Sequence, residues 1–292
     1  MKIGLYSRKV SHSFYPKFIE IIHFLLDQGV DLQVYKSVLD QVSKDLNNQN
    51  NIETFESKNE INKDLDLMIS IGGDGTFLET VTYIQDLDIP ILGINSGRLG
   101  FLADIAPDDI FPALKEVCNS NFQVENRSLI EMESSEKLDC DFNYALNDFT
   151  IRKSDRATLI KIHTWINGEF LNSYWADGLI VSTPTGSTAY SMSVGGPIVV
   201  PESNNFIISP IASHNLTVRP LVVSADHEIK LTVESRTNMH IASLDARSFF
   251  FKKNVEFLLR KSSFTIRVAK IYNHSYFSTI RNKLMWGIDK RN

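Results

Sequence analysis

The sequence predicts an α/β region followed by a mostly β region. Over residues 1–120, short apolar runs alternate with segments of helical spacing. One of these apolar runs leads directly into a turn of three glycines and an aspartate. After residue 120, alternating apolar and polar residues replace most of the helical spacing. We therefore expect an α/β domain over residues 1–120 and a β-rich domain over residues 121–271, with residues 272–292 available to pack back on the first.

The first region alternates predicted strands and helices. Apolar runs suited to buried strands cover residues 2–6, 31–35, 67–71 and 89–94. Helical spacing begins at Tyr15 and again at Phe77, and Gly29 stands where the first helix would be capped. Residues 47–64 are polar, which predicts a loop or a frayed helix. The alternation predicts parallel strands with helices on the sheet faces.

The second region carries the signals of antiparallel strands. Residues 160–166 and 170–175 flank Asn167-Gly168, a pair typical of a two-residue hairpin turn of type I′. Further strands are predicted at residues 179–181, 221–224, 228–233, 239–244 and 264–271. Residues 276–286 return to helical spacing.

Composition excludes several classes of function. The net charge of -5 gives the chain no overall attraction for nucleic acid or anionic membranes. The N-terminus lacks the apolar core of a signal peptide, and no apolar run has the length of a membrane helix. Cys118 and Cys140 show no paired spacing, which predicts reduced thiols. We expect a cytoplasmic protein with neither membrane nor nucleic acid as a partner.

The first chemical signal is Gly72-Gly73-Asp74-Gly75, directly after a predicted buried strand. Ligands of open α/β sheets bind beyond the carboxyl ends of strands, and backbone amides in such a turn favour phosphate oxygens. A carboxylate at this place suits a base for a hydroxyl, or an outer partner of magnesium. The alternative is a tight turn with Asp74 as a helix N-cap. The segment is neither a Walker A loop nor a dinucleotide fingerprint.

The second signal lies in residues 177–197. Seven serines and threonines fall between Ser182 and Ser193, with glycines and prolines among and after them. Small hydroxyls on an adaptable backbone suit ribose and phosphate recognition. Tyr190 can stack on a base or hydrogen-bond through its hydroxyl. The alternative is a surface loop rich in serine and threonine.

Taken together, the two segments resemble those of the NAD kinase family. GGDGT at residues 72–76 matches the first family motif, and residues 183–191 match the most diagnostic block almost letter for letter. Asn147-Asp148 stands where the family usually has Asn-Glu, so its carboxylate is one methylene shorter. GGDG alone also occurs in lipid kinases and phosphofructokinases. The resemblance extends from residue 1 to about residue 286.

The resemblance implies an NAD kinase-like two-domain fold with NAD bound between the domains. It makes Asp74 the catalytic base, in contact with NAD together with Gly75. It also implies that Asn147 and Asp148 hold a ribose, that Asp177 lies near the nicotinamide, and that Arg247 stands where the family often has Gln. The residues implied to line the adenosine part are Thr188, Ala189, Tyr190, Ser191, Met192 and Ser193.

The implied reaction is transfer of the γ-phosphoryl group of ATP, with Mg²⁺, to the 2′-hydroxyl of the adenosine ribose of NAD, giving NADP. The resemblance also implies a homo-oligomer, a dimer or a tetramer. Two alternatives stay open at this point. One is a lipid kinase that shares GGDGT, although no basic amphipathic stretch is present. The other is a non-catalytic NAD(P) sensor with a kinase-like fold.

Overall fold

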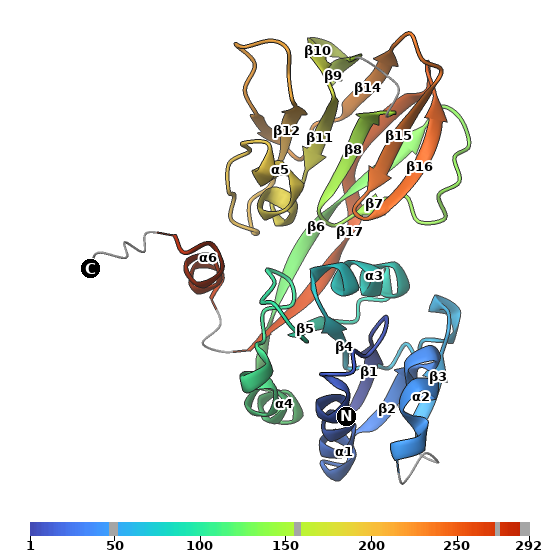
Figure 1. The fold of residues 1–292 in the computed structure, drawn as a ribbon, viewed down its shortest axis with the longest axis vertical. Coiled ribbons are helices and arrows are strands. Elements are labelled where there is room, and N and C mark those ends of the chain that lie inside the picture. Colours follow the sequence, from blue (N-terminus) through green and yellow to red (C-terminus); the bar gives the residue numbers. More distant parts are fainter. Residues whose placement is uncertain (47–51, 155–158, 272–274, 287–292) are drawn as a thin grey trace. The chain divides into compact units, whose positions relative to one another are not determined.

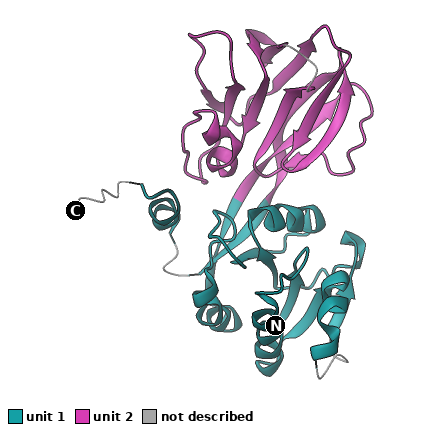
Figure 2. Cartoon of the chain, in the orientation of Figure 1, with its two compact units in different colours: residues 1–126, 266–292 teal, residues 127–265 magenta. Residues whose placement is uncertain are grey.

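The computed structural model describes residues 1–46, 52–154, 159–271 and 275–286 (Figure 1). The chain divides into two compact units, one of residues 1–126 and 266–292, the other of residues 127–265 (Figure 2). Two strands, β6 (Phe122–Ser134) and β17 (Glu256–Ile271), contribute residues to both units. Within the described ranges, no helix combines the length and the apolarity needed to cross a bilayer.

The first unit is built on a parallel sheet, as the alternating pattern predicts. Its strand order is β5-β4-β1-β2-β3, and each neighbouring pair is parallel. The carboxyl-terminal part of β17 lies beside β5, where Val268 pairs with Ile91. The strands are β1 (Lys2–Tyr6), β2 (Asp31–Tyr35), β3 (Ile52–Phe55), β4 (Leu67–Gly72) and β5 (Ile91–Asn95).

Helices of this unit bury one apolar face each. In α1 (Tyr15–Asp27), four apolar residues at helical spacing are fully buried: Phe18, Ile21, Ile22 and Leu25. Gly29 has a φ of 73°, the left-handed conformation that ends a helix without a steric penalty. The other helices are α2 (Lys36–Val42), α3 (Asp74–Ile84), α4 (Ile110–Cys118) and α6 (Tyr276–Leu284).

One segment differs from its prediction. Within 47–64 the structure has the short strand β3 and a 3₁₀ turn over Lys58–Glu60, not a loop or a frayed helix. The signal is weak because β3 is short and two of its four residues are exposed. Its backbone pairs with β2, and this tertiary pairing outweighs local propensity. The first part of the segment, residues 47–51, lies outside the described residues.

The second unit contains antiparallel strands in two groups. One sheet has the order β13-β12-β11-β8-β15-β16. In the other group the neighbouring strands follow the order β10-β9-β14-β17, and β6 pairs with both β17 and β7. The buried faces of both groups form one hydrophobic cluster that includes Phe149, Phe206 and Phe257. The bounds are β7 (Tyr144–Ala145), β8 (Asp148–Lys153), β9 (Ile160–Ile166), β10 (Glu169–Ala176), β11 (Gly178–Ser182), β12 (Asn205–Ile211), β13 (Leu221–Ser224), β14 (Ile229–Glu234), β15 (Met239–Leu244) and β16 (Arg247–Lys252).

The predicted hairpin is confirmed. β9 and β10 pair antiparallel, and both turn residues have a positive φ, 50° at Asn167 and 82° at Gly168. A type I′ turn requires this conformation at both positions, which asparagine and glycine tolerate best.

Candidate active site

The GGDG segment lies at the point of the first sheet where ligands of α/β folds bind. From β1 the chain adds β2 and then β3 on one side, whereas β4 returns to the other side of β1 and β5 follows it. The switch point therefore lies between the carboxyl ends of β1 and β4. Gly72 ends β4, and α3 begins at Asp74. A cavity of about 600 Å³ opens at the same edge after β1, lined in part by Lys9, Ser11 and His12.

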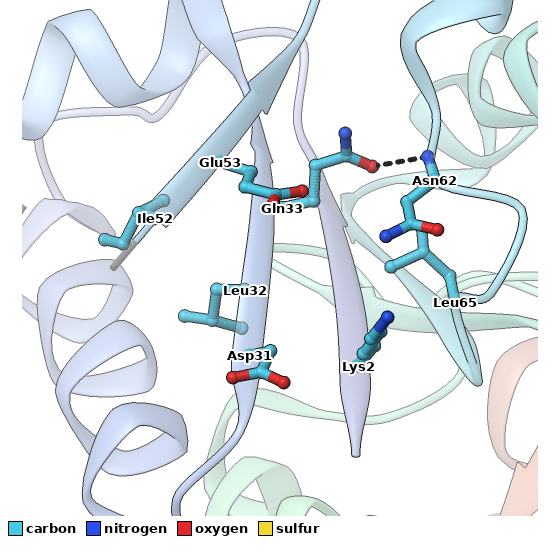
Figure 3. Close-up of a pocket in the computed structure, with 8 residues that line it drawn as sticks. All are labelled: Lys2, Asp31, Leu32, Gln33, Ile52, Glu53, Asn62 and Leu65. Carbon is cyan, nitrogen blue, oxygen red and sulfur yellow. Dashed lines mark hydrogen bonds between the residues drawn. The ribbon is translucent and has the colours of Figure 1, made fainter. Parts of the chain in front are cut away.

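A second hollow of about 310 Å³ lies at the opposite edge of this sheet (Figure 3). It adjoins the amino ends of β1, β2 and β3, with Lys2 and Asp31 at its rim. The Gln33 side chain already has a hydrogen-bond partner there, since its Oε1 accepts the Asn62 N–H at 3.0 Å. The hollow contains none of the predicted site residues.

The carboxylate of Asp74 does not cap its own helix. The N-cap is Gly73, without a side-chain bond. Instead, Asp74 Oδ1 accepts the N–H groups of Leu102 at 2.9 Å and Ala103 at 3.0 Å, and Oδ2 accepts that of Phe101 at 2.9 Å. A fourth donor, Lys283 Nζ, lies 3.4 Å from Oδ2. The N-cap interpretation is therefore wrong, because the side chain is directed to a loop that follows another strand.

That loop, residues 96–103, is held in shape by Asn95 at the end of β5. Asn95 is fully buried; its Oδ1 accepts the Gly97 N–H at 2.6 Å and its Nδ2 donates to the carbonyls of Arg98 and Ala103. At Gly100 an added Cβ would lie 1.9 Å from Asp74 Oδ1. The loop can therefore approach the carboxylate only with glycine at position 100.

A buried ion pair closes the same region. Lys270 Nζ in β17 lies 2.5 Å from Asp104 Oδ2, and their side chains are 11% and 6% exposed. Each charge is paired where water is largely excluded. The pair therefore holds Asp104, the residue directly after the loop, against the neighbouring strand β17.

In the second unit, three segments far apart in sequence meet around Asp245. Its buried carboxylate accepts the N–H groups of Leu146 at 3.0 Å, Asn147 at 2.7 Å and Asp148 at 3.2 Å. The third segment joins through Thr183, whose N–H donates to the Asn147 carbonyl at 2.9 Å and whose hydroxyl donates to that of Leu146 at 2.5 Å. Asn147, Asp148 and the start of the hydroxyl-rich segment are thus brought together.

The hydroxyl-rich segment is a compact pair of helical turns. It consists of a 3₁₀ turn over Thr185–Thr188 and the short helix α5 (Tyr190–Ser193). At Gly186 an added Cβ would lie 2.1 Å from the Asn147 carbonyl oxygen, so only glycine allows this approach.

The hydroxyls of this segment divide into interior and accessible groups. Those of Ser182, Thr183, Ser187 and Ser191 are fully buried, and the Ser191 hydroxyl lies 3.1 Å from that of Ser209. Thr188, Ala189 and Met192 are half-buried, while Tyr190 and Ser193 are exposed. Of the six residues predicted to line the adenosine part, Ser191 thus faces the protein interior.

Asp148 has unusual electrostatics. It is buried, and its Oδ1 accepts the Thr150 hydroxyl at 3.0 Å. Burial, and then the neighbouring charge of Asp245, raises the pKa of Asp148 to about 7, while the Thr150 bond opposes the shift. A carboxyl group that is part-protonated near neutral pH can donate a hydrogen bond as well as accept one.

Asp177 and Arg247 have other partners. Asp177 precedes β11 and pairs with Lys153 at 2.6 Å. Because Ser182 pairs with Asp148 at the other end of the strand, Asp177 and Asp148 are separated by roughly 17 Å of strand. The Arg247 guanidinium donates to the carbonyls of Phe142 and Tyr144, and burial lowers its pKa. Arg247 therefore holds the segment before Asn147, and Asp177 stands apart from it.

The sequence interpretation missed the groups that orient the predicted residues. These are the amides of residues 101–103, the Thr183 hydroxyl, the Asp245 carboxylate and Lys283. Only Asp245 carries a local signal in the sequence, an aspartate in the two-residue turn between β15 and β16, where its φ is 54°.

The described side chains do not by themselves form a metal site. No group of three or more His, Cys, Asp or Glu among them could hold a metal ion. Both oxygens of Asp74 accept two contacts each, from the backbone N–H groups of residues 101–103 and from the Lys283 ammonium group.

Comparison with known proteins decides the family. Residues 5–122 match the model of the ATP-NAD kinase N-terminal domain, and residues 146–271 match that of the C-terminal domain. The protein named NAD kinase of Cytophaga hutchinsonii is 41% identical over 100% of both chains. That of Flavobacterium psychrophilum is 40% identical, also over 100% of both. The chain belongs to the NAD kinase family.

Solved structures of NAD kinases agree in fold. The yeast NADH kinase complexed with NADH has a TM-score of 0.87 at 23% identity, covering 99% of this chain and 88% of that one. The NAD kinase from Archaeoglobus fulgidus in complex with ATP has a TM-score of 0.74 at 25% identity, covering 98% and 99%. The predicted NAD kinase-like architecture, α/β and then mostly β, is confirmed.

We predict that Gly100→Ala disrupts the loop that holds Asp74. The new Cβ would lie 1.9 Å from Asp74 Oδ1, so the loop must move and lose amide contacts. The expected loss of unfolding free energy is about 1–3 kcal/mol, measured by urea denaturation. Gly97→Ala is the matched control, since nothing lies within 4 Å of a Cβ there. Equal losses in the two variants would contradict the close-approach argument.

We predict that Asp148→Asn changes the pH dependence of stability. Because the pKa of Asp148 is raised from 3.8 to about 7 in the folded chain, its contribution to stability is full below pH 3.8 and is lost as pH rises toward 7. Asparagine does not titrate. As pH rises from 5 to 8, the unfolding free energy of the variant should therefore increase relative to that of the parent by on the order of 1–3 kcal/mol.

Urea denaturation at the two pH values measures this gain. The exposed carboxyl of Asp139 provides the control, since Asp139→Asn should leave the pH dependence of the parent in place. A constant difference between Asp148→Asn and the parent at both pH values would rule out titration of Asp148 in this window.

Proposed function

We infer that this chain is an NAD kinase, an enzyme that uses ATP to phosphorylate NAD. The observation that carries the inference is the full-length match to proteins named NAD kinase, about 40% identical over the whole chain. The same chain carries both GGDGT and the hydroxyl-rich block. We further propose that the γ-phosphoryl group goes to the 2′-hydroxyl of the adenosine ribose, giving NADP.

The proposal places the phosphate groups at the GGDG turn. The switch point is the usual ligand position of such sheets, and the N-terminus of α3 favours negative charge there. Added Cβ atoms at Gly73 and Gly75 would meet nothing within 4 Å, so the outer side of the turn is open. A phosphate can therefore approach the backbone at Gly75 closely.

The proposal places a ribose of NAD and the adenine base at the second group. Asn147 and Asp148 are ordered by Asp245 and Thr183, so the backbone at both residues is fixed. A part-protonated Asp148 suits a ribose hydroxyl, which both donates and accepts. By donating as well as accepting a hydrogen bond, Asp148 can bind a ribose hydroxyl in place of the family's usual glutamate. Tyr190 is exposed and available to stack on the base.

Asp74 is proposed as the general base. Its Oδ2 accepts the proton of the ribose hydroxyl while that oxygen forms a bond to the γ-phosphorus, and the bond from phosphorus to the oxygen of the leaving ADP breaks. The amides of Leu102 and Ala103 keep Oδ1 fixed during the step, so the carboxylate holds its direction.

Magnesium is proposed to arrive with ATP. Magnesium commonly keeps several waters and binds through phosphates with one or two carboxylates. Among the described side chains no group of three or more His, Cys, Asp or Glu could hold a metal ion, so the proposed step assigns no residue of this chain to the ion. Bound Mg²⁺ would neutralise charge on the phosphates. The cytoplasmic location and the homo-dimer or homo-tetramer implied by the family resemblance stay predictions.

The reaction is tested by incubating the protein with ATP, Mg²⁺ and NAD and measuring NADP with an NADP-specific dehydrogenase. Diacylglycerol in place of NAD tests the lipid kinase alternative. NADP binding without turnover would favour the sensor. Formation of NADP from NAD and ATP, with no phosphorylation of diacylglycerol, supports the proposed function.

We predict that Asp74→Asn lowers the turnover number by about 10²–10⁴-fold, because the general base is lost. NAD affinity, measured by calorimetry, should remain close to that of the parent. Asp108→Asn, at an exposed carboxyl of the same unit, is the control for charge. Turnover near the parent value in a folded Asp74→Asn variant would show that Asp74 is not the base.

We predict that NAD lacking the 2′-hydroxyl of the adenosine ribose is not phosphorylated. This analogue lacks the oxygen that forms the bond to the γ-phosphorus, and the polar groups built around that hydroxyl are left unpaired when it binds. Mass spectrometry of the products measures this directly. Transfer to another hydroxyl of the analogue would refute the proposed acceptor.

A further inference from the structure

We propose that Lys283, in the last turn of α6, is a catalytic residue of the same active site. In the structure its ammonium group occupies the position on Asp74 that the acceptor hydroxyl needs. When the hydroxyl takes that position, the ammonium group stays beside it and neutralises charge on the phosphoryl group in transfer. This inference rests on the proposed function, and its test separates the two.

The Asp74 carboxylate can accept only a limited number of hydrogen bonds. An ionised carboxylate offers about four lone-pair positions on its two oxygens. Oδ1 accepts Leu102 and Ala103, while Oδ2 accepts Phe101 and faces Lys283 at 3.4 Å. All four positions are therefore in use, and a substrate hydroxyl can reach this base only when one donor leaves.

Of the four donors, Lys283 is the one that can leave Asp74. The three amides belong to the 96–103 loop, which Asn95 holds from within and in which Gly100 allows the close approach. Their bonds are 2.9–3.0 Å long. Lys283 makes the longest of the four contacts, and its side chain is 29% exposed. A long, part-exposed side chain can withdraw without unfolding backbone, so Lys283 is the donor that the hydroxyl replaces.

A second contact keeps Lys283 in the site. Its ammonium nitrogen also lies over the ring of Phe101, 4.5 Å from the ring centre. A cation at this distance from an aromatic face is attracted by the ring, by about 0.5–2 kcal/mol depending on exposure. Because the Phe101 amide is itself bonded to Asp74, the ring that holds the ammonium group is attached to the loop that holds the base.

Helix α6 supports this placement. Its N-terminus is capped by the Ser275 hydroxyl, which accepts the Ser278 N–H at 3.1 Å, and its residues Thr279 and Ile280 are buried. Lys283 lies in the last turn, where the helix dipole favours a positive charge. The contact is therefore made by an ordered element of the first unit.

A cation beside Asp74 has a function in the proposed reaction. Negative charge is carried by the phosphoryl oxygens at the moment when Asp74 takes up the proton, and cations placed there stabilise the transition state. With the hydroxyl on Oδ2, an ammonium group held by Phe101 is within reach of the oxygens of the phosphoryl group that this hydroxyl attacks. Lys283 thus exchanges one anionic partner, Asp74, for another.

Lys283→Met tests the proposal in the full chain. Methionine has a similar length and no charge. We expect the turnover number to fall by about ten- to a hundredfold, while calorimetric NAD affinity and the thermal melting curve stay close to those of the parent. Lys283→Arg should recover part of the loss, because it keeps the charge. Arg281→Met removes an exposed charge from the same helix and should leave turnover unchanged.

A second variant separates catalysis from structure. Phe101→Leu keeps the amide on Asp74 and removes only the ring, so we expect a smaller loss of turnover. The double variant Lys283→Met with Phe101→Leu should lose no more than Lys283→Met alone, since the ring acts through the ammonium group.

Each outcome decides the question. Unchanged or faster turnover in Lys283→Met overturns the proposal, and faster turnover would make the contact a simple block on Asp74. Additive losses in the double variant, or equal losses in Lys283→Met and Arg281→Met, overturn it as well. If the parent protein forms no NADP from NAD and ATP, the proposed function fails, and Lys283 is not the cause.

Discussion

The carboxylate of Asp74 and the three amides that hold it are the constraint on which the first unit depends. Hydrogen bonds to an ionised group contribute about 1.5–3 kcal/mol each, more than bonds between neutral groups. They join the first turn of α3 to a loop that follows β5, the neighbouring strand. Glycine at position 100 allows that loop to approach the carboxylate, buried Asn95 holds the loop from within, and the Asp104–Lys270 ion pair lies directly after it.

The second unit uses the same device for a different purpose. Asp245 also accepts three backbone amides, and by this it orders the Asn147-Asp148 segment. Its carboxylate is buried among protein groups, whereas that of Asp74 is 31% exposed and meets a lysine side chain. The comparison separates a structural carboxylate, closed to ligands, from one that can exchange a partner. Accessibility, not the number of bonds, makes Asp74 the candidate for chemistry.

Local patterns predicted much of the fold, and physical reasons explain the rest. β1, β2, β13 and β15 lie where their apolar runs place them, and the hairpin turn has the backbone conformation that Asn-Gly favours. β6 escaped prediction because its buried residues do not alternate regularly along its 13 residues. β3 was missed because pairing with β2, not its own residues, makes it a strand. Hydroxyl-rich composition could not separate buried Ser187 from exposed Ser193, since both carry the same group.

By itself, the sequence determined the order of the two architectures, the glycine-flanked aspartate at a strand end and the family to which the chain belongs. These depend on residue type and on near neighbours along the chain, which strand periodicity and turn chemistry record. Only the tertiary structure decided what surrounds that aspartate. Its partners stand 27 to 29 residues away in the loop and 209 residues away in α6. Hydrogen bonds and charges act through space, over a few ångströms, so no spacing along the chain reveals which distant donors will arrive at one carboxylate.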